Sequence, residues 1–190
     1  MRINRSLRTT FGKVSSLYDK SRVTYPEELI EKIITYSKIK PNGTILDVGC
    51  GSGQATLPFA QRSFQIIGLD ISKDLLTIAK EKCSSFKSTK FKLSSFEAAK
   101  FNKNSFDLII SELAWHWVTP EKRYGKASRF LKDNGSLALF WSYQQKDKSK
   151  IVTEVGKVLD LYIRKKSGPR MKNYANSVYE ELQHHPLFTN

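Results

Sequence analysis

The sequence predicts an α/β protein with a doubly wound, mostly parallel sheet. Short apolar segments suited to buried strands alternate with segments of helical periodicity, the order that parallel sheets with crossover helices require. The first apolar segment, residues 44–48, runs directly into glycines at positions 49, 51 and 53. The second, residues 66–70, ends in a carboxylate at Asp70. Such sheets bind ligands at the carboxyl ends of their strands, where both features are expected to lie.

The helices near the glycine turn follow from local patterns. A helix is predicted to begin near Pro26, because proline suits a first turn, and its apolar residues share one face until residues 41–43: Leu29, Ile30, Ile33 and Ile34. A second helix is expected over about residues 54–62 and tolerates Pro58 only in its opening turns. Ser72 is a suitable N-cap for a third helix.

The other half of the sheet is predicted from shorter signals. Residues 91–93 form a third strand, and the apolar residues 106–110 form a buried fourth strand. A helix over about residues 120–132 is expected to stop at the turn signal of residues 133–135, and residues 136–141 form the fifth strand.

Three segments follow from this order. Residues 1–39 are interpreted as an N-terminal leader with lid and capping helices, residues 40–142 as the core, and residues 143–190 as a helical C-terminal segment. Within the last segment, residues 151–163 and 174–183 have the periodicity of amphipathic helices.

Composition limits the class of protein and its location. No apolar run approaches the roughly 20 residues of a membrane helix. Two cysteines, Cys50 and Cys83, are too few for a disulfide framework or a zinc site, so we expect no metal and a reducing, cytoplasmic location. The arginines and lysine before Asp19, the first acidic residue, are also typical of a mitochondrial transit peptide, and a capping helix is the competing interpretation.

The net charge of +14 leaves two interpretations open. A strongly basic domain is the usual electrostatic feature of nucleic-acid binding, which makes a polyanionic substrate one interpretation. The lysines are scattered, however, and no RNA-binding signature with stacking aromatics occurs, which favours a solvated lysine-rich surface.

The glycine spacing narrows the class of ligand. A phosphate-binding loop would end in Gly-Lys-Ser/Thr, but Gln54 and Ala55 follow Gly53. A dinucleotide fingerprint places its third glycine three positions after the second, whereas the spacing here is G-x-G-x-G. Asp70 can accept both hydroxyls of a ribose. Cys50 is expected to fill space in the turn rather than to act as a nucleophile.

This spacing, with Asp47 two residues before the first glycine, resembles motif I of the class I S-adenosylmethionine-dependent methyltransferases, which have a Rossmann-like fold. Residues 11–142 are similar to the small-molecule group that includes the trans-aconitate methyltransferases. The similarity rests on four local patterns: YDKSRVTYP (18–26), SSFEA (94–98), AWHWV (114–118) and LKDNG (131–135).

The resemblance implies S-adenosyl-L-methionine as the methyl donor and assigns roles to individual residues. Asp47 would orient the methionine ammonium, Asp70 would hold the ribose, and Glu112 would lie near the methionine moiety. The remaining donor-binding residues would be Gly49, Cys50, Gly51, Ser52, Gly53, Ile71, Ser95 and Phe96. Two of these depart from the family, because Ser95 replaces an aspartate and Phe96 replaces a small residue.

The substrate is expected to contact the lid and the segment after the fourth strand: Tyr18, Arg22, Tyr25, Trp115 and Trp117. Arg22 could anchor a carboxylate or be a solvated lid residue. His116 is the candidate general base, with lining of the pocket as the alternative. The tryptophans could shield the sulfonium, although at least one is expected to pack in the core.

The family has seven strands, of which the last two form an antiparallel hairpin, and this chain ends at Asn190 before they would begin. We therefore expect a shortened chain whose residues 137–141 form a hydrophobic sheet edge, and either a monomer or a dimer through that edge. The predicted function is methyl transfer to a small molecule, such as a carboxylate like trans-aconitate. A vestigial donor-binding fragment and an RNA methyltransferase are the alternatives.

Overall fold

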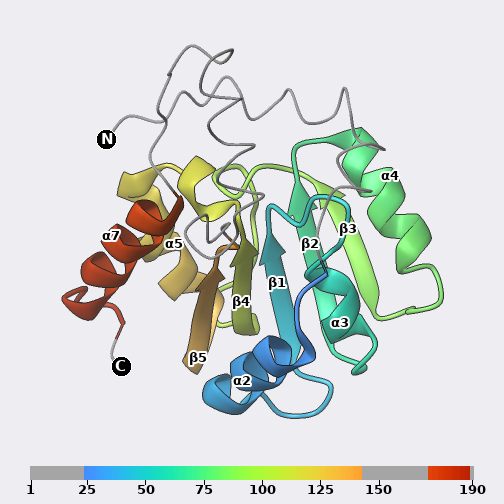
Figure 1. The fold of residues 1–190 in the computed structure, drawn as a ribbon, viewed down its shortest axis with the longest axis horizontal. Helices are drawn as coiled ribbons and strands as arrows, with labels where there is room; N and C mark the ends of the chain where they lie inside the picture. The colour runs from blue at the N-terminus through green and yellow to red at the C-terminus, as the bar shows by residue number, and fades with distance from the viewer. Residues whose placement is uncertain (1–23, 143–170, 189–190) are drawn as a thin grey trace, which may run out of the picture. The chain divides into compact units, whose positions relative to one another are not determined.

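The computed structural model describes residues 24–142 and 171–188. Within them lies one parallel five-stranded sheet with the order β3-β2-β1-β4-β5 (Figure 1). The strands are β1 (Thr44–Val48), β2 (Gln65–Asp70), β3 (Thr89–Leu93), β4 (Phe106–Glu112) and β5 (Leu131–Phe140). The predicted fold class is therefore confirmed, and the strand order reverses between β1 and β4, where such sheets bind ligands.

The helices are α2 (Glu27–Ser37), α3 (Thr56–Ala60), α4 (Lys73–Lys82), α5 (Pro120–Phe130) and α7 (Met171–Gln183), with a short 3₁₀ turn, η3 (Trp115–Trp117). Ser72 caps α4 as predicted, because its hydroxyl accepts a hydrogen bond from the Leu75 N–H at 3.3 Å. α3 is shorter than the predicted helix over residues 54–62, since the turn of the glycine loop continues to its start.

The junction of α5 and β5 differs from the prediction. The helix ends at Phe130, and the residues predicted as a turn lie inside β5. Asn134 has a φ of 63°, and the register with β4 shifts between the pairs Phe106–Leu131 and Leu108–Ser136. The sequence therefore correctly predicted a turn-like backbone at residues 133–135 but wrongly placed the start of the strand after it. The left-handed residue and the register shift are accommodated within β5 as a bulge.

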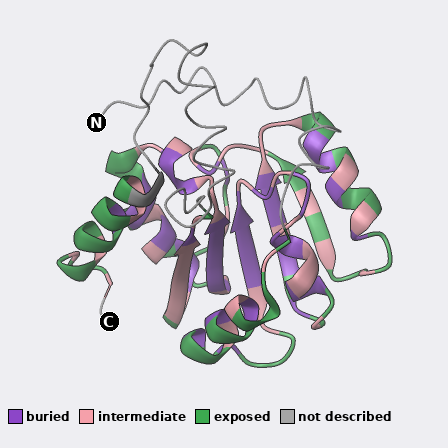
Figure 2. Cartoon of the chain, viewed as in Figure 1, coloured by how far each residue is buried: buried purple, intermediate pink, exposed green. Residues whose placement is uncertain are grey.

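The two halves of the sheet carry their helices on opposite faces. The crossover through α3 connects β1 to β2, whereas the crossover through α5 connects β4 to β5 in the opposite direction, and both are expected to be right-handed. α2 and α3 cover the front of the sheet in Figure 1. Their apolar residues pack on alternate residues of the central strands, which Figure 2 shows as buried.

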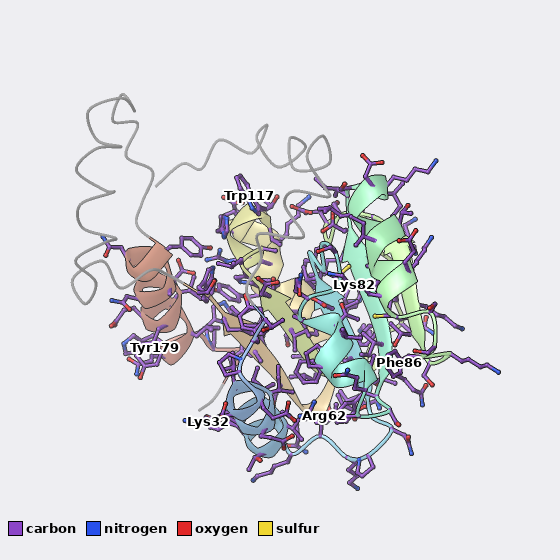
Figure 3. The ribbon with its side chains drawn as sticks, turned by 45° about the vertical axis from the view of Figure 1, so that its right-hand side comes forward. Lys32, Arg62, Lys82, Phe86, Trp117 and Tyr179 are labelled. Carbon is purple, nitrogen blue, oxygen red and sulfur yellow. The ribbon has the colours of Figure 1, made fainter. Side chains whose placement is uncertain are left out.

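A charged contact joins α2 to the turn that follows α3 at the surface. Arg62, labelled in Figure 3, forms ion pairs with Glu27 and with Glu31, the latter at 2.8 Å. Its Nη1 also donates to the carbonyl of Pro58 at 2.8 Å. α2 is thereby held beside the helix that follows the glycine turn.

The opposite face has an aromatic core. The Phe96 ring lies 5.6 Å from Trp115 and 6.0 Å from Phe130, measured between centroids. Phe101 meets Phe106 and Phe130 edge to face at 5.0 and 5.3 Å. Edge-to-face aromatic pairs of this kind contribute about 0.5–1.5 kcal/mol each beyond the area that they bury.

The chain divides into two compact units, Met1–Phe140 and Trp141–Asn190. In the second unit, the Trp141 ring meets Tyr174 of α7 at 5.6 Å. The predicted boundaries after residues 39 and 142 stay predictions, as does the predicted leader, which lies outside the described residues.

β5 is an outer strand of the described sheet, and residues 135–139 in it are partly exposed. Association through this edge stays a prediction. In the described part of the chain, none of the helices has the length and apolar character needed to cross a bilayer.

Candidate functional site

The glycine turn follows β1 and is fixed to β2. Gly49, Gly51 and Gly53 have φ values of 73°, 53° and 82°, in the left-handed region that favours glycine. The N–H groups of Gly49 and Cys50 donate to the Leu69 carbonyl at 2.8 and 2.9 Å. The turn therefore lies at the carboxyl ends of β1 and β2, as the sequence predicted.

The three glycines serve different purposes. A Cβ on Gly49 would lie 2.3 Å from the Cβ of Ala114, and one on Gly53 would lie 3.3 Å from the Cβ of Ala79 in α4. A Cβ on Gly51 would have no atom of the described residues within 4 Å. Two glycines thus allow close packing within the protein, and Gly51 alone faces open space that a ligand can enter.

The other two residues of the turn are buried. Cys50 is 3% exposed, and a Cβ on Gly68 would lie 2.9 Å from its Sγ, so the thiol fills the space beside β2. Burial raises the pKa of this thiol well above its ordinary value, which disfavours a nucleophilic role. Ser52 is 2% exposed, and no described residue hydrogen-bonds its hydroxyl.

Asp70 is held in one orientation by two backbone groups. Its Oδ2 accepts from the Gly51 N–H at 2.9 Å, and its Oδ1 accepts from the Ser72 N–H at 2.8 Å. Burial nevertheless raises the pKa of this carboxyl. Each oxygen keeps a second lone pair, which a ribose hydroxyl can use. Ile71, which follows, is partly exposed beside the turn.

Asp47 is the most unusual group of the site. It is fully buried in β1, and its Oδ2 accepts from the Thr56 hydroxyl at 2.6 Å. Its Oδ1 has no hydrogen-bond partner among the described residues. Burial is the largest cause that raises the pKa of Asp47 to about 7; the charges of Glu112 and Asp70 also raise it, and the hydrogen bond from Thr56 lowers it. Thr56 was not predicted from the sequence.

Glu112 lies at the end of β4, beside β1 in the sheet. The Tyr25 hydroxyl donates to its Oε1, and the Tyr25 ring meets Phe140 edge to face at 5.2 Å. After Glu112 the chain turns through Leu113, whose φ is 48°, and this turn brings Ala114 against Gly49. Three carboxylates from adjacent strands therefore surround the glycine turn.

The residues after β3 are held by internal contacts. The Ser95 hydroxyl accepts from the Ala98 N–H at 3.2 Å, and Phe96 is 3% exposed within the aromatic core. Glu97 accepts two hydrogen bonds from Thr119, from its N–H and its hydroxyl, both at 3.0 Å. The Phe96 side chain thus contributes to packing, and contact of Ser95 and Phe96 with the adenine stays a prediction.

The segment after β4 contains both a core and a surface tryptophan. Trp115 is fully buried, so it is the tryptophan expected to pack in the core, while Trp117 is partly exposed near the start of α5 (Figure 3). His116 is 7% exposed with its ring 4.8 Å from that of Trp117. Burial lowers the pKa of His116 to about 4, which makes it a weak general base near neutral pH.

Two predicted substrate residues, Tyr18 and Arg22, lie outside the described residues. In the described ranges, no group of histidine, cysteine and acidic side chains could hold a metal ion.

The site fits the donor that the sequence predicted. The buried Oδ1 of Asp47 accepts no hydrogen bond from a described residue, so an N–H group of a ligand can satisfy it. The negative charges of Glu112 and Asp70 nearby favour a cation such as an ammonium group. Asp70 presents its carboxylate beside the open space at Gly51 and suits a ribose.

Comparison with known proteins agrees with this geometry. Residues 46–139 match the family described as "Methyltransferase domain". An uncharacterized methyltransferase of Mycobacterium tuberculosis is 25% identical over 155 residues, which are 82% of this chain and 60% of that protein. A Saccharomyces cerevisiae protein named "Probable S-adenosylmethionine-dependent methyltransferase" is 28% identical over 69% of this chain and 46% of its own length. The chain thus spans about half the length of the curated relatives it matches.

Solved structures show the same fold. The YcgJ protein of Bacillus subtilis has a TM-score of 0.54 and 23% identity over 71% of this chain and 58% of its own. A Methanococcus maripaludis protein, provisionally named as an S-adenosyl-L-methionine-dependent methyltransferase, has a TM-score of 0.59 and 21% identity over 82% and 74% of the two chains.

Proposed function

Because residues 46–139 match the methyltransferase-domain family and have the class I, S-adenosylmethionine-dependent methyltransferase fold, we propose that this chain binds S-adenosylmethionine and methylates a small molecule. The observation that carries the proposal is the convergence of Asp47, Asp70 and Glu112 around the open space at Gly51. When bound, the donor supplies an electrophilic methyl group on a sulfonium.

The residues of the chain contribute binding and orientation. Asp47 and Glu112 would hold the ammonium end of the donor, and Asp70 would accept its ribose hydroxyls. Fixing both ends orients the methyl group for in-line attack, which is the main requirement of this reaction. Trp117 and His116, beside one another after β4, would exclude water from the acceptor side.

A carboxylate is the acceptor class that we propose. A carboxylate is ionised at neutral pH and needs no general base, whereas a hydroxyl or ammonium must lose a proton. His116 is buried with a pKa of about 4, and a base that weak suits an acceptor that is already deprotonated. The proposed anchor for a second carboxylate of such an acid is Arg22.

Calorimetric titration with S-adenosylhomocysteine tests the donor site. We expect the wild type to bind and Asp70→Asn to bind at least tenfold more weakly, because a charged hydrogen bond to the ribose contributes about 1.5–3 kcal/mol. Asp74→Asn, at an exposed position in the first turn of α4, removes the same charge and should bind normally. No binding by the wild type, or equal binding by Asp70→Asn, would contradict the proposal. Binding without methyl transfer to any carboxylate would identify a non-catalytic donor-binding protein.

One observation favours a polyanionic acceptor as the second candidate. Lys122, Lys126 and Arg129 recur along one side of α5. Burial lowers the pKa of Lys126, and the positive charges of Arg129 and Lys122 lower it as well, against the raising effect of the Glu97 charge. Lys92 lies on the same face of the sheet, with its ammonium 5.5 Å from the ring centre of Phe101. A clustered positive face is the feature that phosphodiester backbones recognise.

Fluorescence anisotropy with a labelled single-stranded RNA separates the two candidates. If RNA is the acceptor, the pair Lys122→Glu and Arg129→Glu should weaken binding by at least tenfold at 0.1 M salt and lower its salt dependence. Lys80→Glu with Lys87→Glu makes the same change of charge at exposed positions in and after α4. Equal losses in both pairs would indicate non-specific attraction and exclude the α5 face as an RNA site.

A further inference from the structure

We propose that Thr56 is a positioning residue for the methyl donor: its hydroxyl holds the Asp47 carboxylate in one orientation and supports its negative charge, and the charged carboxylate attracts the donor's ammonium group. The inference rests on the proposed function and deepens it. It assigns a role to Thr56, which the sequence did not indicate.

The contact between Thr56 and Asp47 closes the glycine turn. Asp47 lies in β1 just before the turn, and Thr56 is the first residue of α3 after it. Both residues are fully buried, and the Thr56 hydroxyl donates to Asp47 Oδ2 at 2.6 Å. Because both partners are removed from solvent, loss of the hydroxyl leaves a buried acceptor without its donor.

The hydrogen bond determines which oxygen of Asp47 remains for a ligand. A hydroxyl has a single hydrogen, and Thr56 uses it at Oδ2. Oδ1 is buried and accepts no hydrogen bond from a described residue. A carboxylate that is fixed through one oxygen loses little further rotamer freedom on binding, so Oδ1 is preorganised for an N–H group of the donor or for a water that it holds.

The same hydrogen bond supports the charge of Asp47. Burial is the largest cause that raises the pKa of this carboxyl to about 7, and the charges of Glu112 in β4 and Asp70 in β2 raise it as well. The hydrogen bond from Thr56 lowers the pKa, because it stabilises the ionised form. Asp47 is therefore partly ionised near neutral pH, and the Thr56 hydroxyl increases the ionised share.

Two thiols also interact with Asp47. Burial raises the pKa of Cys50 in the turn and of Cys83 at the end of α4, and the charge of Asp47 raises both as well. Both thiols therefore stay largely neutral up to about pH 8.5. A change in ligand binding near neutral pH that requires the Thr56 hydroxyl is accordingly assigned to Asp47.

Removal of the hydroxyl should have an effect that depends on pH and on the ligand. Without the hydroxyl the pKa of Asp47 rises further, so the carboxyl is mostly protonated at pH 7 and no longer attracts an ammonium group. At higher pH the carboxylate ionises again, and much of the attraction returns. A ligand without an ammonium group should be unaffected at either pH.

The test compares two ligands on the same variants by calorimetry. S-adenosylhomocysteine carries the ammonium group, whereas 5′-methylthioadenosine has the same adenosine and sulfur without it. Thr56→Val, which replaces the hydroxyl by a methyl group, should bind S-adenosylhomocysteine about tenfold more weakly than the wild type at pH 7 and about threefold more weakly at pH 8.5. Its affinity for 5′-methylthioadenosine should stay within about twofold of the wild type at both pH values.

Two further variants provide the controls. Thr56→Ser keeps the hydroxyl and should bind S-adenosylhomocysteine within about threefold of the wild type, and it decides the matter if Thr56→Val does not fold. Thr77→Val makes the same substitution at an exposed position in α4, where the hydroxyl donates to the Lys73 carbonyl at 3.1 Å. Thr77→Val should change neither affinity.

A double-mutant cycle adds a second measurement. Asp47→Asn should weaken S-adenosylhomocysteine binding, and Thr56→Val added to it should weaken binding less than it does in the wild type, because the two residues act through one contact.

The outcomes separate the inference from the function on which it rests. Equal weakening for both ligands would mean that Thr56 only supports the fold, and a loss of equal size at pH 7 and pH 8.5 would mean that it does not act through the charge of Asp47. Either result overturns the inference while the donor site stands, as does unchanged binding by Thr56→Val or a tenfold loss in Thr56→Ser. Absence of S-adenosylhomocysteine binding in the wild type would instead overturn the proposed function.

Discussion

Asp47→Asn is expected to make the protein more stable than the wild type at pH 8 while weakening donor binding. The carboxyl of Asp47 has a pKa of about 7 when folded, against 3.8 for the free side chain, because it is fully buried. That difference corresponds to a destabilisation of about 4 kcal/mol once both states are ionised. The amide retains an oxygen for the Thr56 hydroxyl but buries an unpaired N–H that costs about 1–3 kcal/mol, so we expect a net gain of about 2 kcal/mol.

The sign of this effect determines its pH dependence. The folded pKa of Asp47 is raised, so the destabilisation is absent below about pH 4, grows as the pH rises towards 7, and is complete above pH 7. Urea unfolding at several pH values should therefore show the advantage of Asp47→Asn shrinking from pH 8 to pH 4. A variant less stable than the wild type at pH 8 would contradict the prediction. Asp74→Asn controls for the loss of a surface charge.

His116 gives the wild type a second, opposing pH dependence. Its folded pKa of about 4 lies below the ordinary value of 6.5, so its contribution to stability is complete above pH 6.5 and is lost as the pH falls to about 4. In the wild type the two groups largely cancel across this range. In Asp47→Asn the contribution of His116 should be opposed less, so the stability of this variant should increase more from pH 4 to pH 6.5 than that of the wild type.

The buried carboxylate of Asp47 therefore lowers the stability of the folded protein when no ligand is bound. A bound ammonium group would stabilise the ionised carboxylate, so binding the donor should recover much of the lost stability. The unsatisfied Oδ1 and the neighbouring charges of Glu112 and Asp70 are therefore understood as features of a binding site rather than of a structural core.

The sequence predicted the sheet and the position of the site because these depend on local patterns. The apolar strands, the turn at Gly49 and the acid at Asp70 lie within a few residues of one another, and the capping by Ser72 is also local. The boundary of β5 was wrong because a left-handed residue, Asn134, suits a strand irregularity as well as a turn.

Other features of the site depend on contacts between distant residues. The contact of Tyr25 with Glu112 spans 87 positions, and no spacing in the sequence indicates it. Thr56 could have been suspected only from its place in the first turn of a helix that follows the glycine turn. Trp115 is the buried tryptophan because its ring packs against Phe96, a contact between distant parts of the chain. The sequence alone therefore could not show whether Trp115 or Trp117 would be buried.

The glycine turn provides the second large effect, as a contrast between Gly49→Ala and Gly51→Ala. At Gly49 the new Cβ would lie 2.3 Å from the Cβ of Ala114, on a backbone with φ of 73°, so strain and overpacking should together destabilise the protein by about 2–4 kcal/mol. At Gly51 the new Cβ meets no atom of the described residues within 4 Å, and the left-handed backbone costs about 1–2 kcal/mol.

Gly51→Ala should lose less stability than Gly49→Ala but, among the molecules that are folded, it should lose more affinity for the methyl donor. Because the Cβ of Gly51→Ala enters the open space beside Asp70, we expect S-adenosylhomocysteine to bind at least tenfold more weakly, although the variant remains folded. Urea unfolding and calorimetry on the two variants separate the two effects. Normal binding by Gly51→Ala would show that the donor does not use this space. A Gly49→Ala protein as stable as the wild type would show that the approach of Ala114 is adjustable, and that the turn is shaped by its backbone conformation rather than by packing.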